Sequence, residues 1–376
     1  MLEKLKQTLR GQKETGPFRI PGQVGDGSRV LALATEDLAD LLFHVPLLAA
    51  MRRTYPGASI DFLVPEQFAP LVIPCGLARQ VMVYAPRQLT GWKPAYRNLQ
   101  RSLAGKRYDV SFVLSQTPVP PLEALGQATG AALRLGPSHG GAWPAVNLEL
   151  RPRDDAGYAG DRLHLLAPFL GLEPGILRTA WPLPTDKLRQ AAQVVHFNKP
   201  RPEELLVGID PGPDKSGRAL GQENLLFLVG QVRSQLSCRV LPLTSPEGED
   251  RRREFESRLP SPIPPAFNRD TLLETMLLLC QCNLFVAGNT DLFHVAVAEG
   301  IPTVGLFGEH VPARWRPRDR DRCRILTVSP GKKLDLATLM DAVTAVTAVG
   351  SGDATSEASP PPLSGPLSGP SPAPGA

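Results

Sequence analysis

The chain has 376 residues, of which 42% are hydrophobic and 21% are charged, which is enough for two domains with apolar cores and excludes disorder throughout. Its 41 basic and 37 acidic residues nearly balance, so the overall charge does not indicate a nucleic-acid partner. No long apolar run predicts a membrane-spanning helix, and the charged start does not resemble a signal peptide. We therefore expect a cytoplasmic protein with reduced cysteines.

Composition divides the chain into a folded body and flanking segments. A short apolar helical stripe precedes a Gly/Pro-rich stretch at the N-terminus, and the C-terminus is rich in Ser, Pro and Gly, which predicts disorder. Four prolines around residues 182–202 mark an interdomain connection. The predicted parts are an N-terminal helical extension (1–28), a first domain (29–183), a linker (184–204), a second domain (205–349) and a disordered tail (350–376).

In the first domain, short apolar runs alternate with longer amphipathic ones. In chain order, the predicted elements are a strand at 29–35, a helix at about 40–54, strands at 59–64, 80–84 and 109–114, and a helix at about 122–129. This alternation is typical of a doubly wound parallel sheet.

The second domain repeats the pattern. Its predicted strands are 205–209, 239–243, 284–287, 303–306 and 324–328, and its helices are near 222–235, 271–282 and 292–299. The predicted fold class is therefore α/β, with two Rossmann-like domains that face a central cleft. Ligands of open parallel sheets bind at the carboxyl ends of the strands, so the loops that follow strands are the candidate sites.

The loop after the first strand carries three carboxylates, Glu36, Asp37 and Asp40. One of them could serve as a general base. An acidic residue at a helix start also caps free amide groups and interacts favourably with the helix dipole. Both interpretations stay open for Asp40.

The loop that follows the first strand of the second domain offers Lys215 and Arg218 to a phosphate. It is not a Walker A loop, because Asp214 occupies the position of the glycine before the lysine. Nucleoside triphosphate turnover is therefore a weak alternative, and a simple turn is another.

A third loop, 287–294, lies at the end of a strand and leads into a helix. The start of a helix favours the binding of an anion. Its polar side chains could equally cap the helix, with His294 as a structural histidine. Cys280 and Cys282 lack a second cysteine pair at zinc-like spacing. We expect no metal site.

Taken together, these segments resemble glycosyltransferase family 9, the heptosyltransferase family, over about residues 29–346. Residues 29–48 are similar to the family's first strand, Gly-Asp loop and Pro-x-Leu helix. Residues 287–298 and 300–308 are similar to its Asp-Thr-Gly-x-x-His donor segment and the strand that follows. The resemblance implies a GT-B architecture, with an acceptor-binding first domain, a nucleotide-sugar-binding second domain and metal-independent inverting transfer.

The resemblance also implies roles for particular residues. Asp40 is the expected catalytic base, and Arg218 is the first choice for the cation that binds the diphosphate, with Lys215 as the alternative. The expected donor-binding residues are Arg218, Lys215, Glu247, Glu249, Asn289, Thr290, Asp291 and His294.

Four positions depart from the family pattern. Ala39 replaces the glycine before the base, Ala34 replaces a frequent basic residue, Asn289 replaces the donor-binding aspartate, and Asp291 replaces its glycine. Asn289 keeps hydrogen-bonding capacity without charge, whereas Asp291 brings a carboxylate near the expected phosphate.

We therefore expect transfer of a sugar, with heptose from ADP-heptose as the candidate, to a lipopolysaccharide-core or other cell-envelope glycan. The nucleotide-sugar donor is a substrate, and no further cofactor and no nucleic acid is expected. A basic face of the first domain suggests peripheral contact with the inner membrane surface. The alternative is a non-catalytic nucleotide-sugar or glycan-binding protein that kept the fold.

Overall fold

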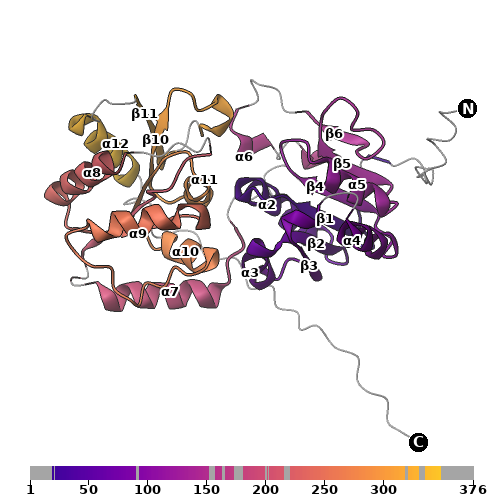
Figure 1. Ribbon diagram of the computed structural model, residues 1–376, viewed down its shortest axis with the longest axis horizontal. Coiled ribbons are helices and arrows are strands. Elements are labelled where there is room, and N and C mark those ends of the chain that lie inside the picture. The colour runs from indigo at the N-terminus through magenta and orange to yellow at the C-terminus, as the bar shows by residue number, and fades with distance from the viewer. Residues whose placement is uncertain are drawn as a thin grey trace, which may run out of the picture.

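The computed structural model describes most of the chain between residues 19 and 348. The described residues are 19–20, 22–89, 93–151, 157–162, 166–172, 181–199, 201, 203–215, 221–317, 321–329 and 335–348. Most of the predicted N-terminal extension, the predicted tail and Arg218 lie outside them. Figure 1 shows two helix-flanked sheets side by side.

The first sheet has six parallel strands in the order β3-β2-β1-β4-β5-β6. Their bounds are β1 Arg29–Ala34, β2 Ser59–Pro65, β3 Gln80–Tyr84, β4 Val110–Leu114, β5 Leu133–Pro137 and β6 Leu148–Leu150. This strand order is that of the Rossmann fold. We keep the name first domain for the part of the chain built on this sheet.

Helices cover both faces of the first sheet. The α-helices are α2 Leu38–Thr54, α3 Ala69–Val72, α4 Pro94–Ala104, α5 Pro120–Ala128 and α6 Ala159–Arg162. Alternate residues of β1 point to opposite faces, so Ala32 packs in the core with α2, whereas Leu31 packs with Tyr96 and Leu103 of α4. The sheet is therefore doubly wound.

The second sheet has five parallel strands in the order β11-β10-β9-β7-β8. Its strands are β7 Leu205–Ile209, β8 Cys238–Pro242, β9 Leu284–Ala287, β10 Thr303–Gly308 and β11 Cys323–Val328. The helices are α7 Thr185–Asn198, α8 Gln222–Gln235, α9 Glu249–Ser257, α10 Leu272–Leu279, α11 Asp291–Ala298 and α12 Leu336–Ala348. With this second Rossmann-like unit, the predicted α/β fold class is confirmed.

Short 3-10 turns connect several of these elements. They are Glu66–Phe68, Ile73–Cys75, Pro86–Gln88, Pro168–Leu170, Pro246–Gly248 and Ala313–Trp315. A search of the described residues for a helix that is apolar and long enough to span a bilayer finds none.

The helix α2 lies between the first sheet and the second domain. It packs against α11 on one side, and 13 of its 17 residues are buried. The amphipathic pattern expected from the sequence is therefore absent, because both sides of the helix are covered. Its start is also earlier than predicted, since Asp37 caps it by accepting a hydrogen bond from the amide of Ala39 at 2.9 Å.

Other boundaries differ from the prediction for local reasons. The helix α10 ends at Leu279 rather than near residue 282, because residues 280–282 form a turn whose amides bond to the last carbonyls of the helix. The helix α9 has one buried residue, Phe255, among charged ones, so it lacks an apolar period that would have indicated it.

A buried carboxylate ties three parts of the first domain together. Asp61 on β2 is 1% exposed, and its oxygens accept hydrogen bonds from Arg79 Nε at 3.0 Å, Arg79 Nη2 at 2.6 Å and the Tyr108 hydroxyl at 2.8 Å. Buried charge is tolerated when its hydrogen-bonding capacity is filled in this way.

We expect Arg79→Ala to destabilise the protein by about 2 kcal/mol, because it leaves the Asp61 carboxylate buried with one remaining donor. Urea denaturation measures the loss. The control is Arg87→Ala, an exposed arginine without a carboxylate partner in the described chain, which should change stability by less than about 0.5 kcal/mol. Equal effects of the two substitutions would contradict a stabilising role for the Asp61 cluster.

Candidate active site at the domain junction

The carboxyl ends of both sheets meet where α2 packs against α11. Asp40 lies in the first turn of α2 and is 4% exposed. Its carboxylate accepts hydrogen bonds from Ser115 Oγ at 3.1 Å, Thr35 Oγ1 at 3.3 Å and the Gln116 amide at 3.2 Å. Because Asp37 provides the helix cap, Asp40 is left to point into the junction between β1 and β4.

Burial is the main cause of an unusual pKa at Asp40. Desolvation and the nearby charge of Asp37 raise the pKa of Asp40 to about 7, against the opposing effects of Ser115, Gln116 and Lys215. A carboxylate with this pKa exchanges a proton readily near neutral pH. This is the property that a general base requires.

Lys215 links the two domains. Its Nζ lies 2.7 Å from Asp37 Oδ1 in the first domain and 2.5 Å from Asp291 Oδ1 at the start of α11. The ammonium group also lies 5.3 Å from the centre of the Trp315 ring. Burial disfavours the charged lysine, but Asp291 and Asp37 outweigh it, so the pKa of Lys215 is raised. We call these three residues the ion cluster.

His294 is fully buried beside the ion cluster. Its Nε2 lies 3.0 Å from Asn289 Oδ1, and its Nδ1 lies 2.8 Å from the Tyr158 hydroxyl. Because an amide oxygen only accepts hydrogen bonds, the network assigns the proton to Nε2 and leaves Nδ1 to accept from Tyr158. Burial lowers the pKa of His294, so the ring is neutral and both nitrogens are satisfied.

Aromatic rings enclose this histidine. Phe43 of α2 lies against His294 with centroids 5.5 Å apart, and it stacks with Trp315 at 6.1 Å. Tyr158 stacks on His294 at 5.7 Å. Since Phe43 and Tyr158 belong to the first domain, the rings bring apolar surface from both domains together around His294.

The loops at the floor of the second domain are closely packed. Asp210 follows β7, is 1% exposed, and accepts the Gly212 amide at 2.8 Å. Burial raises the pKa of Asp210 to about 6. A Cβ on Gly212 or Gly248 would approach Thr244 Oγ1 to 2.5 Å and 2.1 Å, respectively, so both positions require glycine.

The predicted donor segment converges on this site. Thr290 caps α11 by accepting the Phe293 amide at 3.3 Å, and the Asn289 carbonyl accepts the Lys215 amide at 2.9 Å. The structure thus brings Lys215, Asn289, Thr290, Asp291 and His294 together. It does not describe Arg218.

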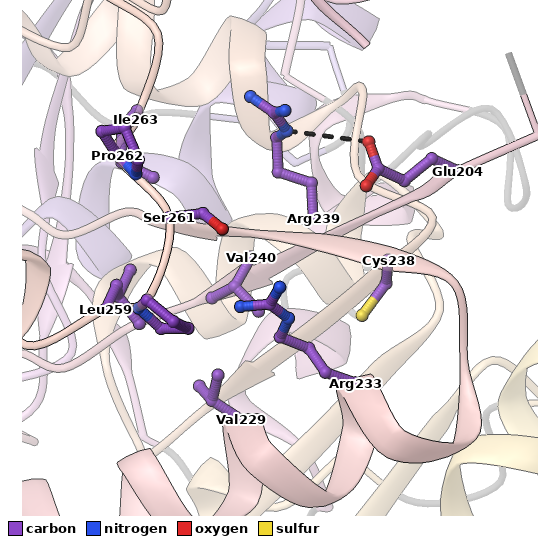
Figure 2. A pocket seen from close by; sticks show the side chains of 11 residues that line it. Glu204, Val229, Arg233, Cys238, Arg239, Val240, Leu259, Ser261, Pro262 and Ile263 are labelled. Atoms are coloured by element: carbon purple, nitrogen blue, oxygen red, sulfur yellow. Dashed lines mark ion pairs between the residues drawn. The ribbon is translucent and has the colours of Figure 1, made fainter. Parts of the chain in front are cut away.

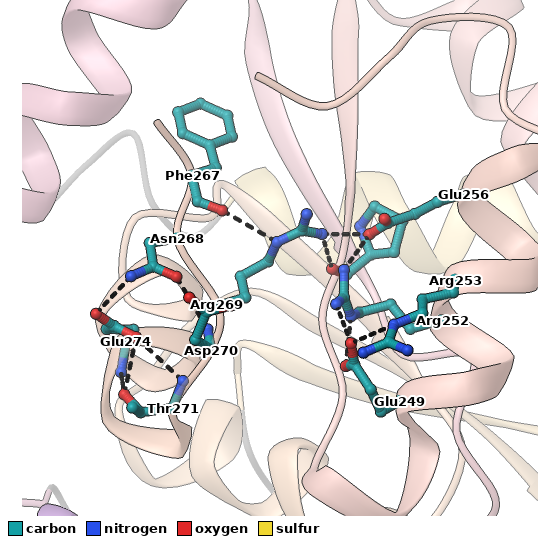
Figure 3. A network of polar contacts seen from close by, with 11 residues as sticks. Glu249, Arg252, Arg253, Glu256, Phe267, Asn268, Arg269, Asp270, Thr271 and Glu274 are labelled. Carbon is teal, nitrogen blue, oxygen red and sulfur yellow. Dashed lines mark hydrogen bonds and ion pairs between the residues drawn. The ribbon is translucent and has the colours of Figure 1, made fainter. Parts of the chain in front are cut away.

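The two glutamates that were predicted to bind the donor have different surroundings from each other. Glu247 is exposed in the turn before α9. Glu249 pairs with Arg252 and Arg253 of its own helix, in a network that continues through Glu256 to Arg269 (Figure 3). The carboxylate of Glu249 is therefore engaged by arginines of its own helix, and the link from α9 to Arg269 runs through Glu256.

Several site residues were not assigned a role from the sequence. Asp37 was one of three candidate carboxylates, and Trp315 ends a loop that follows β10, so both had a weak signal. Asp210 begins the loop after β7 that is a candidate phosphate-binding loop, although its own side chain was given no role, and Tyr158 had no signal because no motif surrounds it. Among the described residues, no cluster of His, Cys, Asp and Glu has an arrangement that could hold a metal ion.

Two hollows lie away from the ion cluster. One, of about 40 Å³, lies beside β8 between Arg233, Arg239 and the 259–263 segment, with Glu204 3.7 Å from Arg239 (Figure 2). It has room for water rather than a nucleotide. A more open one, of about 330 Å³, lies between the start of α8 and α9 and is lined by Gln222, Arg251 and Arg258 among others.

Comparison with known proteins gives one family match and several similar folds. Residues 233–342 match the model of glycosyltransferase family 9 (heptosyltransferase). No curated protein matches the chain.

Among solved structures, a family 9 glycosyltransferase from Veillonella parvula has a TM-score of 0.68 and 15% identity, covering 87% of this chain and 100% of its own. The Escherichia coli ADP-heptose lipopolysaccharide heptosyltransferase II has a TM-score of 0.64 and 19% identity, covering 86% and 99%. The E. coli heptosyltransferase WaaC, solved with ADP-2-deoxy-2-fluoro heptose, has a TM-score of 0.61 and 18% identity, covering 83% and 98%.

At these identities the structures establish a shared fold, and the family model covers much of the second domain. Residues 233–342 match the family 9 model, the described part of the chain shares the GT-B fold of heptosyltransferases, and the family resemblance inferred from the sequence is thereby confirmed.

Proposed function

We propose that the protein transfers a sugar from a nucleotide-sugar donor to a cell-envelope glycan, with ADP-heptose and a lipopolysaccharide core as the candidate donor and acceptor. The proposed transfer inverts the anomeric centre and uses no metal ion. The observation that carries the proposal is Asp40, a buried carboxylate with a pKa of about 7 at the junction of two Rossmann-like domains. The WaaC structures with ADP and with an ADP-heptose analogue make ADP the first nucleotide to test.

In this proposal, ionised Asp40 accepts the proton of an acceptor hydroxyl. The hydroxyl oxygen forms a bond to the anomeric carbon as the bond from that carbon to the diphosphate breaks, and the nucleoside diphosphate leaves with the electron pair. One displacement of this kind inverts the anomeric centre. Ser115 and the Gln116 amide hold the carboxylate in position, as base catalysis requires.

The leaving diphosphate needs positive charge near it. Lys215 and the amino end of α11 supply a cation and a helix dipole at one place. Asp37 and Asp291 already pair with Lys215, so the donor must compete with two carboxylates for the ammonium group. Since Asp291 stands where the family has glycine, this competition is a property of this chain.

That competition also favours a second candidate function. Two carboxylates around one buried lysine weaken any site for a diphosphate, which suits a non-catalytic protein that binds a glycan or a nucleotide-sugar weakly. Nucleotide binding and transfer therefore need separate measurements.

Calorimetric titration of ADP, UDP and GDP without metal tests the donor site. We expect ADP to bind, Lys215→Ala to weaken binding at least tenfold, and Asp291→Asn to strengthen it about tenfold, because a competing charge is removed. Lys187→Ala, on the exposed face of α7, is the control. If neither the native protein nor Asp291→Asn binds any nucleotide, the donor site is refuted. Binding without transfer would favour the second candidate.

The pH dependence of transfer tests Asp40. Because the base must be ionised, kcat/KM should rise with pH through about 7 and then level off. Asp40→Asn should lose roughly 10²-fold or more. Asp37→Asn should move the rise to lower pH, since the charge of Asp37 raises the pKa of Asp40. If kcat/KM is constant within experimental error between about pH 5 and about pH 8, Asp40 is excluded as the base.

A further inference from the structure

A buried amide group beside Asp40 has no partner within the described protein. The side-chain nitrogen of Gln116, Nε2, is shielded from solvent, and none of the described residues accepts a hydrogen bond from it. Gln116 follows β4 at the carboxyl edge of the first sheet, the edge at which parallel sheets bind ligands. A buried donor without an acceptor destabilises a folded protein, so native structures keep few of them. The position of this one indicates contact with a ligand.

The backbone of Gln116 is held in place from both sides. Its backbone amide donates to Asp40 Oδ1 at 3.2 Å. Ser115 Oγ accepts the Thr117 amide at 3.1 Å and lies 2.6 Å from the Thr117 carbonyl oxygen, which closes a tight turn around Gln116. The side chain therefore starts from a fixed point, one hydrogen bond away from the carboxylate of Asp40.

The carboxylate of Asp40 has capacity for a further hydrogen bond. An ionised carboxylate offers about four lone-pair sites. Ser115, Thr35 and the backbone amide of Gln116 donate to three of them, and in the proposed reaction the acceptor hydroxyl takes the fourth. A sugar held at one point can still rotate, so positioning for the displacement requires a second contact.

Other polar groups of the junction are already engaged. Lys215 is paired with Asp37 and Asp291, and both ring nitrogens of His294 are hydrogen-bonded within the protein. Among the described residues that contact Asp40, Gln116 is the one with a buried donor that no described atom satisfies. It is therefore the best placed of them to supply the second contact.

We propose that the side chain of Gln116 binds the acceptor sugar, with Nε2 donating a hydrogen bond to an oxygen that neighbours the hydroxyl deprotonated by Asp40. The inference rests on the proposed function, since it names a contact in the same site. It specifies an acceptor with two neighbouring oxygens, because one must donate to Asp40 and the other must accept from Nε2. An acceptor without the second oxygen leaves the amide unpaired and binds more weakly.

An ordered water molecule is the alternative partner of Nε2. Buried waters satisfy polar groups that the protein leaves without a partner, and the loss of such a water destabilises the fold. The two partners predict opposite effects of an apolar side chain of similar length. If the partner is the substrate, the free protein becomes more stable when the amide is removed, because an unsatisfied donor disappears. If the partner is a structural water, the free protein becomes less stable.

Thermal denaturation of the full chain without ligands distinguishes these cases. Gln116→Met removes the amide and should raise the melting temperature by about 2 °C. The matched control is Thr54→Val, because Thr54 Oγ1 is also buried without a hydrogen-bond partner. It lies in the last turn of α2, about 21 Å along the helix from Asp40, and its removal should likewise not lower stability. A lower melting temperature of Gln116→Met than of the native protein would overturn the proposal.

Carboxyl carbon NMR tests where the side chain lies. Gln116→Glu places a second carboxylate beside Asp40, so the titration midpoint of Asp40 should rise by about one pH unit. Gln193→Glu, on the exposed face of α7, adds the same charge far from the junction and should leave the midpoint unchanged. If Gln116→Glu also leaves it unchanged, the side chain points away from Asp40 and the proposal is wrong.

Transfer kinetics test the contact itself. With ADP-heptose as the donor and a lipopolysaccharide-core oligosaccharide as the acceptor, Gln116→Met should raise the KM for the acceptor about tenfold and leave the KM for the donor unchanged. Thr54→Val should match the native protein. An unchanged acceptor KM in Gln116→Met would refute the contact. If the native protein transfers no sugar, the proposed function fails, and the melting and NMR results still decide whether Gln116 holds an amide for a ligand beside Asp40.

Discussion

The ion cluster is the interaction on which the candidate site depends. Lys215 comes from the loop after β7, Asp37 from the cap of α2, and Asp291 from the start of α11, so one ammonium group joins two domains and two helix starts. The cluster fixes α2 against α11 and places a net negative charge beside Asp40. Asp37 thereby serves three purposes, because it caps a helix, pairs with Lys215 and raises the pKa of Asp40.

Aromatic side chains from both domains pack beside these charges. Phe43, Tyr158 and Trp315 surround a neutral His294 whose two nitrogens are both hydrogen-bonded. Asp40 and His294 are buried, and charges interact more strongly in buried surroundings than they do at a surface. Burial raises the pKa of Asp40, and the carboxylates of Asp291 and Asp37 raise the pKa of Lys215 and keep it charged. A buried carboxylate with a raised pKa and a charged lysine thus lie at one junction.

Much of the fold was predictable because it rests on local patterns. Strands β3, β7 and β9 and helix α8 have the predicted bounds, since the strands are short apolar runs and the helix has apolar residues at helical spacing. The charged helix α9 was not predicted, because its stability comes from ion pairs and one buried ring. The pairs of Glu249 with Arg252 and Arg253 nevertheless follow a helical spacing that is readable in the sequence.

The site was predictable only where its residues are neighbours in the chain. Asn289, Thr290, Asp291 and His294 lie within one loop and helix turn, so a motif identifies them together. The pairing of Lys215 with Asp37 spans 178 positions and depends on how the domains meet, as does the contact of Tyr158 with His294. Nothing in a local pattern specifies such contacts.

A direct measurement of the Asp40 pKa tests the account most closely. Carboxyl carbon NMR of protein labelled at aspartate, with the Asp40→Asn variant to identify the signal, reports the titration of this one group. The account predicts a midpoint near 7. A midpoint near 4, on the order of the value for an exposed aspartate, would contradict the claim that the domain junction holds a desolvated base.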